Sequence, residues 1–383
     1  MNTAKQTGVM FPFPASQPSQ VADMIPRIQR RPASGMILFS VLGAMVPGCC
    51  FGVAISPGSD STAGLGNTAN AIVQIANPAA VGSGTIIQMM PYNGGMDLDV
   101  LTADHVLRNA AGGGSSLYAA NQIDITFGNT GGGGASFAAE DEATLFDLPL
   151  DGSSAVDLAI LDVFVPGSQL NTLPAGLASV ALPNAQTAAN AAITQAGYSP
   201  QASVVNLGGT LSYVYSPLYG YGAPYGTLKA GPNTVSGAGV TTITGAVSAY
   251  AGQNYVYQGF QNNCVINGTS PNYNGSTSFI FGGDSGGPSL SGNTIFGVHS
   301  SSTRSTLTGN LGNDPNSQVA DSTDTWQDVN VYNYLPWINM ELATLSIPEP
   351  SIGSLVVAGG VMMIVVRRHL RKARTAGNHF KTA

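Results

Sequence analysis

The sequence predicts an all-β protein, built as a barrel or a sandwich of antiparallel strands. Short β-prone runs recur between breaks of Gly, Asn and Pro, at residues 123–127, 202–207, 211–215, 240–244 and 254–260. Only 9% of the 383 residues are charged, and glycine is abundant with 49 residues. Many short strands separated by turn signals are typical of all-β architectures. No strong amphipathic helix pattern occurs before residues 332–345.

The N-terminal segment, residues 1–54, is expected to direct export. Three arginines between residues 27 and 31 precede an apolar run at residues 35–46, which small residues follow. This arrangement is typical of a secretory signal, here with a long region before the apolar run. Translation from Met24 would shorten that region. Lipid attachment at Cys49 is the alternative to simple cleavage, and the nearby proline disfavours it.

The segment between residues 55 and 345 is strongly acidic. It holds three basic and 18 acidic residues, a formal net charge of −15. Such a charge repels nucleic acid and anionic lipid, so no nucleic-acid partner is expected. Cys264 is the only cysteine in this segment, which excludes an intramolecular disulfide within it.

Residues 282–288 read Gly-Gly-Asp-Ser-Gly-Gly-Pro and place Ser285 among glycines. A serine nucleophile needs a base to take its proton and donors for the oxygen that becomes negative. Glycines let backbone N–H groups turn toward a substrate. We therefore expect the N–H groups of Gly283 and Ser285 to form an oxyanion hole, with Asp284 holding the loop in shape. A Gly-rich turn with an incidental serine is the alternative interpretation.

A base and an acid precede this serine in the chain. Residues 100–106 form an apolar run, expected to be a strand that ends on His105. Residues 156–161 form a second predicted strand, which Asp157 opens. The chain order is therefore His, Asp, Ser, one of the known orders of a catalytic triad. His105 is the expected general base and Asp157 the group that orients it.

Other aspartates lie close to these positions. Asp147 and Asp151 fall in a predicted loop, and Asp162 lies five residues beyond Asp157 on the same predicted strand, so it faces the other side. Asp104 directly precedes His105. Its carboxylate is expected either to raise the pKa of His105 or to point to solvent.

These segments resemble those of the trypsin/chymotrypsin-like serine endopeptidases. Thr-Ala-Asp-His at residues 102–105 is similar to the family's Thr-Ala-Ala-His. Asp-Leu-Ala-Ile-Leu at residues 157–161 is similar to its Asp-Ile-Ala-Leu-Leu, and the motif around Ser285 matches in full. Among the competing aspartates, only Asp157 lies where the family places its acid.

The resemblance covers about residues 67–345, with residues 55–66 as a linker to the export segment. It also includes residues 82–87 and the closing segment 331–338. It implies two antiparallel six-stranded β-barrels and a C-terminal helix. Barrel one would span about 67–166 and carry His105 and Asp157, and barrel two would span about 190–331 and carry Ser285.

The resemblance also bears on substrate preference. Phe279 lies six residues before Ser285, where trypsin-like enzymes carry a pocket aspartate, so cleavage after Lys or Arg is not expected. Residues 296–300 are similar to the pocket wall of glutamyl endopeptidases, which implies that His299, Ser300 and Ser302 bind substrate and favour Glu. A preference for small or apolar side chains is the alternative. A buried, backbone-bonded strand histidine is the structural alternative for His299.

No Ile-Val-Gly-Gly-type segment occurs near residue 67. In trypsin-like zymogens such a segment supplies the new N-terminus that pairs with the aspartate before the nucleophile. Asp284 therefore needs another partner.

The C-terminal segment, residues 346–383, resembles the PEP-CTERM sorting signal of bacteria. Pro-Glu-Pro at 348–350 is followed by an apolar run at 352–366 and a basic cluster. The resemblance implies transient anchoring of this helix in the inner membrane and processing by an exosortase-type sorting enzyme. Delivery would be to the cell surface, outer envelope or extracellular matrix. A plain single-pass anchor is the alternative.

The sequence thus predicts an exported serine endopeptidase that acts on protein or peptide substrates through an acyl-enzyme. No cofactor or metal is expected, because the acidic positions 314–324 fit no EF-hand loop. A catalytically idle, protease-fold adhesin or matrix protein is the alternative from another functional class. Ester hydrolysis by the same triad also remains open.

Overall fold

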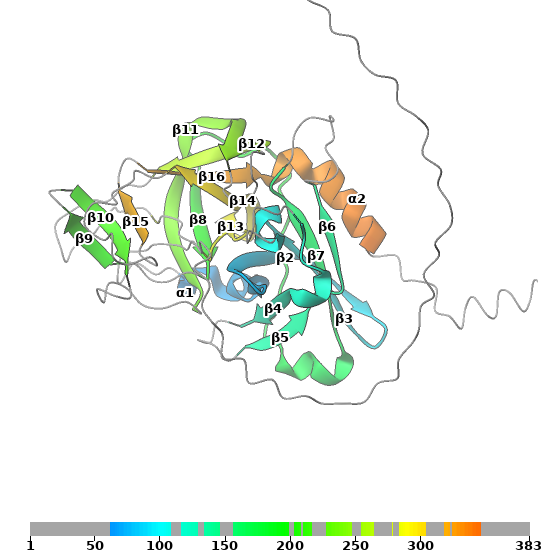
Figure 1. The fold of residues 1–383 in the computed structure, drawn as a ribbon. Coiled ribbons are helices and arrows are strands. Elements are labelled where there is room, and N and C mark those ends of the chain that lie inside the picture. Colours follow the sequence, from blue (N-terminus) through cyan, green and yellow to red (C-terminus); the bar gives the residue numbers. More distant parts are fainter. Residues whose placement is uncertain are drawn as a thin grey trace, which may run out of the picture. The chain divides into compact units, whose positions relative to one another are not determined.

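The computed structural model describes residues 62–108, 116–128, 134–145, 156–198, 203–207, 210–216, 227–246, 254–263, 278, 283–303, 318–321 and 324–345. The expected export segment 1–54, the sorting signal 346–383 and its apolar run 352–366 lie outside these residues. Within the described ranges, no helix is long and apolar enough to cross a membrane. The strands pair antiparallel in the sheets of Figure 1, which confirms the all-β prediction.

The N-terminal half of the described chain forms a seven-stranded sheet in the order β5-β4-β1-β2-β3-β7-β6. Short helical turns precede it and lie between its strands. The bounds are α1 (Thr62–Leu65), η1 (Gly66–Ala71), β1 (Ile72–Ala76), β2 (Val81–Tyr92), β3 (Gly95–Thr102), η2 (Asp104–Leu107), η4 (Ala120–Gln122), β4 (Asp124–Phe127), β5 (Ala135–Ala138), β6 (Asp141–Thr144), β7 (Ala159–Val165) and η5 (Gly167–Thr172).

This sheet differs from the expected six-stranded barrel because one extended segment changes partners. β5 pairs with β4, and only two residues later β6 pairs with β7 at the opposite edge of the sheet. Between them, Ala139 N donates to Ile123 O and Glu140 N donates to Asp162 O, both at 2.8–2.9 Å. Residues 135–144 therefore act as a strand that switches from one edge to the other, and the switch divides it into two elements.

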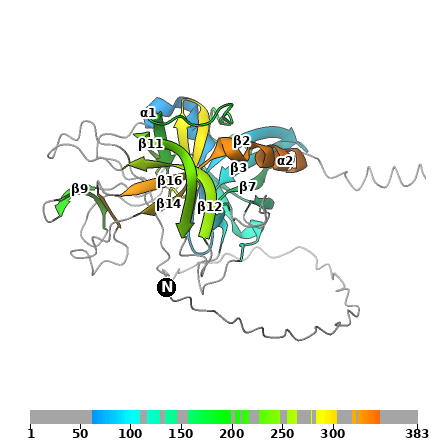
Figure 2. The same ribbon diagram turned by 90° about the horizontal axis from the view of Figure 1, so that it is seen from above.

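The C-terminal half forms a closed six-stranded barrel in the order β11-β12-β16-β14-β13-β8. β8 pairs with both β11 and β13, which closes the ring. Figure 2 shows the long β11 and β12 strands curving side by side. The bounds are β8 (Ala192–Gly197), β11 (Lys229–Ala246), β12 (Asn254–Asn263), β13 (Pro288–Ser291), β14 (Thr294–Thr303) and β16 (Thr325–Asn330).

A separate three-stranded sheet has the order β15-β10-β9, with bounds β9 (Ser203–Leu207), β10 (Thr210–Tyr215) and β15 (Gln318–Asp321). After β16 the chain turns through η6 (Val331–Tyr334) into α2 (Leu335–Leu345), where the sequence predicted a helix. Trp337, Ile338 and Leu342 on α2 are buried in a hydrophobic core that includes residues of the seven-stranded sheet and the closed barrel. Burial of these apolar side chains is the main force that holds α2 in place.

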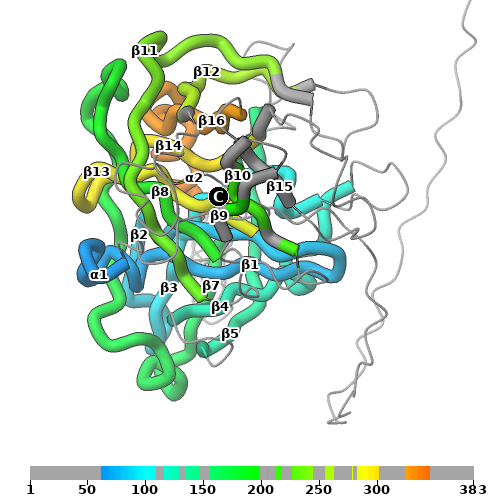
Figure 3. Tube along the Cα trace, turned by 90° about the vertical axis from the view of Figure 1, so that its left-hand side faces the viewer, coloured from blue at the N-terminus to red at the C-terminus, as the bar shows by residue number. Residues whose placement is uncertain are grey.

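Tyr198 connects the closed barrel to the seven-stranded sheet. It follows β8, which runs beside β1 and β2 in Figure 3. Its hydroxyl donates to Ile72 O at 3.0 Å, and its backbone N donates to Ser83 Oγ at 3.0 Å. Tyr198 is 2% exposed, so these bonds satisfy polar groups that water does not reach.

Three acidic side chains gather on one face of the seven-stranded sheet. Asp99 on β3 lies directly opposite Asp162 on β7, and Asp97 is two residues from Asp99. Burial and the charge of Asp97 raise the pKa of Asp99 to about 7. Burial, a hydrogen bond with Asp97 and the charges of Asp97, Asp99 and Glu140 raise the pKa of Asp162 to about 8. This face therefore keeps protons at neutral pH that the unfolded chain releases.

The stability of the sheet should fall as the pH rises from about 4 to about 8, because the unfolded state binds fewer protons across this window. Asp162→Asn should raise the melting temperature at pH 8 by roughly 3 °C and change it little at pH 5. Calorimetry at both values checks this, with the exposed Asp124→Asn as a control. An equal shift at both pH values would contradict the shared-proton interpretation.

Candidate active site

His105 lies on a short helical turn that follows β3. The strand ends at Thr102, and Asp104–Leu107 form η2, so the prediction of a strand that ends on His105 is wrong by three residues. Asp104 pairs with Arg108 four residues later, a spacing at which a helical turn brings side chains together. Asp157 likewise precedes its strand, because β7 begins at Ala159.

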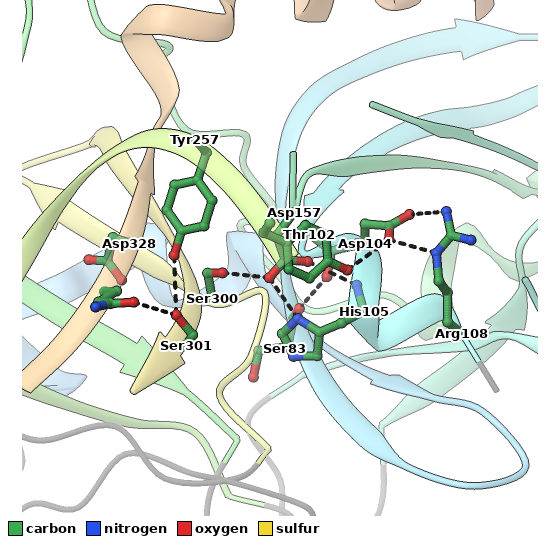
Figure 4. Close-up of polar contacts among 12 residues, drawn as sticks. Ser83, Thr102, Asp104, His105, Arg108, Asp157, Tyr257, Ser300, Ser301 and Asp328 are labelled. Atoms are coloured by element: carbon green, nitrogen blue, oxygen red, sulfur yellow. Dashed lines mark hydrogen bonds and ion pairs between the residues drawn. The ribbon is translucent and has the colours of Figure 1, made fainter. Parts of the chain in front are cut away.

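Asp157 and His105 form a close pair (Figure 4). His105 Nδ1 lies 2.7 Å from Asp157 Oδ2, and the backbone N–H of His105 donates to Asp157 Oδ1 at 2.9 Å. A third donor, Ser300 Oγ on β14, lies 2.6 Å from Asp157 Oδ2. Asp157 is fully buried, whereas the His105 side chain is 15% exposed. The pair thus leaves the other ring nitrogen of His105 as the atom available for proton transfer.

The electrostatics of this pair favour charge on both partners. Burial opposes ionisation of Asp157, but the charge of His105 and the hydrogen bonds from His105 and Ser300 outweigh it and lower the pKa of Asp157. Burial also opposes the charged form of His105. The charge and hydrogen bond of Asp157, and then the charge of Asp104, outweigh that effect and raise the pKa of His105 above its usual 6.5. Asp157 can therefore stabilise an imidazolium at His105.

Of the competing aspartates that the structure describes, Asp104 and Asp162, neither has a hydrogen bond to the His105 ring. Asp162 belongs to the acidic face described above, opposite Asp99. Asp147 and Asp151 lie outside the described residues. Asp104 is fully buried and bonded to Arg108, so it does not point to solvent.

Ser285 lies in the turn that leads into β13 and is 7% exposed. Gly283 and Gly286 adopt φ angles of 107° and 83°, which side-chain-bearing residues rarely adopt. A Cβ on Gly286 would also overlap Thr102 Oγ1 and the carbonyl of Ser83. The turn therefore packs against the end of β3, next to the turn that carries His105.

Ser83 on β2 holds the Ser285 turn by donating hydrogen bonds to the carbonyl oxygens of that turn. Ser83 Oγ donates to Gly283 O at 2.6 Å, and Ser83 N donates to Ser285 O at 2.8 Å. Within the described part of the chain, no partner is found for the N–H groups of Gly283, Asp284 or Ser285. Among the described residues, the turn thus has its carbonyls bonded and these N–H donors without a partner, which is the arrangement an oxyanion hole needs.

Asp284 is fully buried, and neither of its carboxyl oxygens has a hydrogen-bond partner among the described residues. It packs on Gly197 at the end of β8, where any Cβ would overlap the carboxyl group. Burial raises the pKa of Asp284 well above its usual value. The raised pKa favours the protonated carboxyl, because an unpaired buried charge is costly.

His299 on β14 is completely buried, and its ring forms a hydrogen bond with a side chain. His299 Nδ1 lies 2.8 Å from Asp328 Oδ1 on β16. Asp328 also accepts from Asn262, Ser289 and Trp326. The structural alternative for His299 is therefore correct in its burial on a strand, but the ring bonds to a side chain and not to the backbone. His299 Nε2 has no partner among the described residues.

The other residues predicted to bind substrate are Ser300, Ser302 and Phe279. Ser300 directs its hydroxyl to Asp157 rather than to a substrate. Ser302 lies on β14, but its side chain is not among the described ones, and Phe279 lies outside the described residues.

Sequence reasoning missed several functional contacts. Ser83, Ser300 and Tyr255, which bonds to Asp104, depend on contacts 100 or more residues away in the chain. The one available signal was that Ser83 lies between two glycines, a pattern that permits close approach of another backbone.

No protein-family model matches the chain, and a search of the curated proteins finds no significant match.

Ser83→Ala should distort the Ser285 turn, because Gly283 O and Tyr198 N would lose their bond to the hydroxyl. We expect a loss of stability on the order of 2 kcal/mol. Thr85→Val is the matched control, since Thr85 is buried two residues along β2 and its hydroxyl has no partner within the described ranges. Denaturant unfolding measures both variants. Equal stabilities would show that Ser83 does not hold the turn.

Proposed function

We propose that this protein is a serine endopeptidase. The observation that carries the proposal is the buried Asp157 carboxylate, which holds His105 by its backbone and its ring while Ser300 donates to the same oxygen. A histidine fixed by a buried acid next to a glycine-framed serine is the geometry of nucleophilic acyl transfer.

In this proposal Ser285 Oγ attacks the carbonyl carbon of the scissile peptide bond while His105 takes the hydroxyl proton. The carbonyl oxygen becomes negative and is held by the N–H groups of Gly283 and Ser285. His105 then gives its proton to the departing amine, which leaves an acyl group on Ser285. Water, activated by the same histidine, releases the acyl group and restores the serine. Asp157 keeps the ring oriented throughout.

The arrangement of the sheets supports a chymotrypsin-like fold for this chain. His105 and Asp157 come from the seven-stranded sheet, and Ser285 comes from the closed barrel. The strand that switches edges at residues 139–140 makes the first sheet equivalent to a six-stranded barrel with one divided strand. The finer assignment of two six-stranded barrels is part of this proposal.

We further propose that the chain is exported from a bacterium and sorted to its surface by the segments 1–54 and 346–383. The basic and apolar patterns of both segments support this. An exosortase-type enzyme would process the second segment.

An active-site-directed phosphonate should label the full chain at one position. Ser285→Ala should abolish labelling, and His105→Ala should slow it by about four orders of magnitude. Ser291→Ala, at an exposed serine on β13, should label normally. Mass spectrometry of the intact protein gives the result. A folded protein that does not react would leave the protease-fold adhesin or matrix protein as the better assignment.

The pH dependence and the location of labelling refine this test. Because only neutral His105 can take a proton, and its pKa is raised, the labelling rate should still be rising with pH above 6.5. A membrane-impermeant phosphonate should label intact cells. Labelling only after lysis would contradict surface delivery.

We propose that the substrate-binding group near Ser285 is His299, with a preference for Glu over Lys or Arg. The backbone N–H of His299 donates to Gly287 O in the segment that follows Ser285, and the ring Nε2 of His299 is unpaired in the described region. Since Asp328 binds Nδ1, Nε2 is the ring nitrogen left to contact a substrate carboxylate.

His299→Ala should reduce the ratio of kcat/KM for Glu over Ala peptides by about tenfold or more. Ser301→Ala, on the same strand and bonded to Gln327 and Tyr257 but not to His299, is the control. A peptide-library profile measures both. If Glu is not preferred, or the ratio is unchanged, the small or apolar preference is correct.

A further inference from the structure

Asp104, the residue before His105, is the centre of a buried ionic cluster (Figure 4). Arg108 Nε donates to Asp104 Oδ2 at 2.7 Å, and Arg108 Nη2 donates to Asp104 Oδ1 at 3.0 Å. The Tyr255 hydroxyl donates to Asp104 Oδ2 at 3.0 Å. These three residues are 0%, 4% and 1% exposed. The paired, two-point contact from arginine is the strong and geometrically specific form of this interaction.

The cluster joins two parts of the fold at the position of His105. Asp104 begins η2 and Arg108 directly follows it, so the two flank His105 on a single turn. Tyr255 comes from β12 of the closed barrel, 151 residues away in the chain. The turn that carries His105 is therefore tied to the barrel that carries Ser285.

We propose that Asp104, Arg108 and Tyr255 form a positioning cluster that fixes the His105 turn against the closed barrel. Asp157 and Ser300 make the other such link, since Asp157 binds His105 and Ser300 lies on β14. Because the two links start from neighbouring residues of one turn, they restrict both the displacement and the rotation of that turn. Such restriction matters because small misplacements of a catalytic group lower rates steeply.

The cluster also balances charge around the imidazole. The charged groups near His105 are Asp157, Asp104 and Arg108, and the titratable hydroxyls packed nearby are those of Tyr255 and Tyr257. Asp104 acts to raise the pKa of His105, and the guanidinium bound to it opposes that effect. Removal of the Asp104 charge and removal of the Arg108 charge should therefore shift the pKa of His105 in opposite directions.

The test is a proton titration of His105 in the full chain, read by NMR of labelled histidine. The chain has four histidines, so single replacements assign the signals. Asp104→Asn should lower the pKa of His105, and Arg108→Met should raise it. The double variant should lie between them. Asp99→Asn, a buried acid on β3 outside the cluster, should leave it unchanged.

A second variant covers the case in which the single-charge variants fail to fold. Tyr255→Phe keeps both charges and removes only the link to the barrel. Its phosphonate labelling rate at saturation should fall about threefold to tenfold with little change in half-saturating concentration. Shifts of the same sign in the two single variants, or an unchanged rate in Tyr255→Phe, would overturn the proposal.

The catalytic consequence rests on the proposed protease function, but the titration does not. If the wild-type chain titrates as expected and does not react with phosphonate, the proposed function fails and the electrostatic part of the cluster stands. If it reacts and the titrations do not move oppositely, the cluster fails alone.

Discussion

The Asp157 carboxylate is completely buried, and an isolated charge in that environment is costly. Its three donors are the His105 backbone, the His105 ring and the Ser300 hydroxyl. Two of them come from η2 and one from β14, so compensation of this single charge requires the seven-stranded sheet and the closed barrel to meet at one place. The orientation of His105 follows from that requirement rather than from any property of the turn itself.

In the Ser285 turn, the carbonyl oxygens and the N–H groups have different roles. Ser83 uses the carbonyl oxygens of Gly283 and Ser285, and Gly286 N donates to His299 O. The N–H groups that remain are those an incoming carbonyl oxygen would need. The Asp284 carboxyl lies under the same turn without a partner among the described residues, and burial raises its pKa. The turn is thus held by backbone contacts and by close packing at glycine, not by an ion pair at Asp284.

Much of the fold was predictable from local pattern. All five β-prone runs coincide with strands, because alternation and turn residues are local properties. The ends of strands were less predictable. The strand before His105 stops at Thr102 because Asp104 and Arg108 pair across a helical turn. The divided strand at residues 139–140 also escaped prediction, because a change of partner depends on which edges lie nearby.

The sequence by itself determined the all-β class, the acidic and disulfide-free character of the segment 55–345, and the identity and order of His105, Asp157 and Ser285. These properties follow from the types of the residues and their spacing, because residue type and spacing determine where turns form and how charge is distributed. Only the tertiary structure decided what surrounds them. The local patterns around Ser83 and Ser300 do not indicate the contacts that these residues make, Tyr255 has no distinctive local pattern, and Asp104 could have faced solvent. Their roles arise because buried polar groups need hydrogen-bond partners, and folding alone brings these partners together across more than 100 residues.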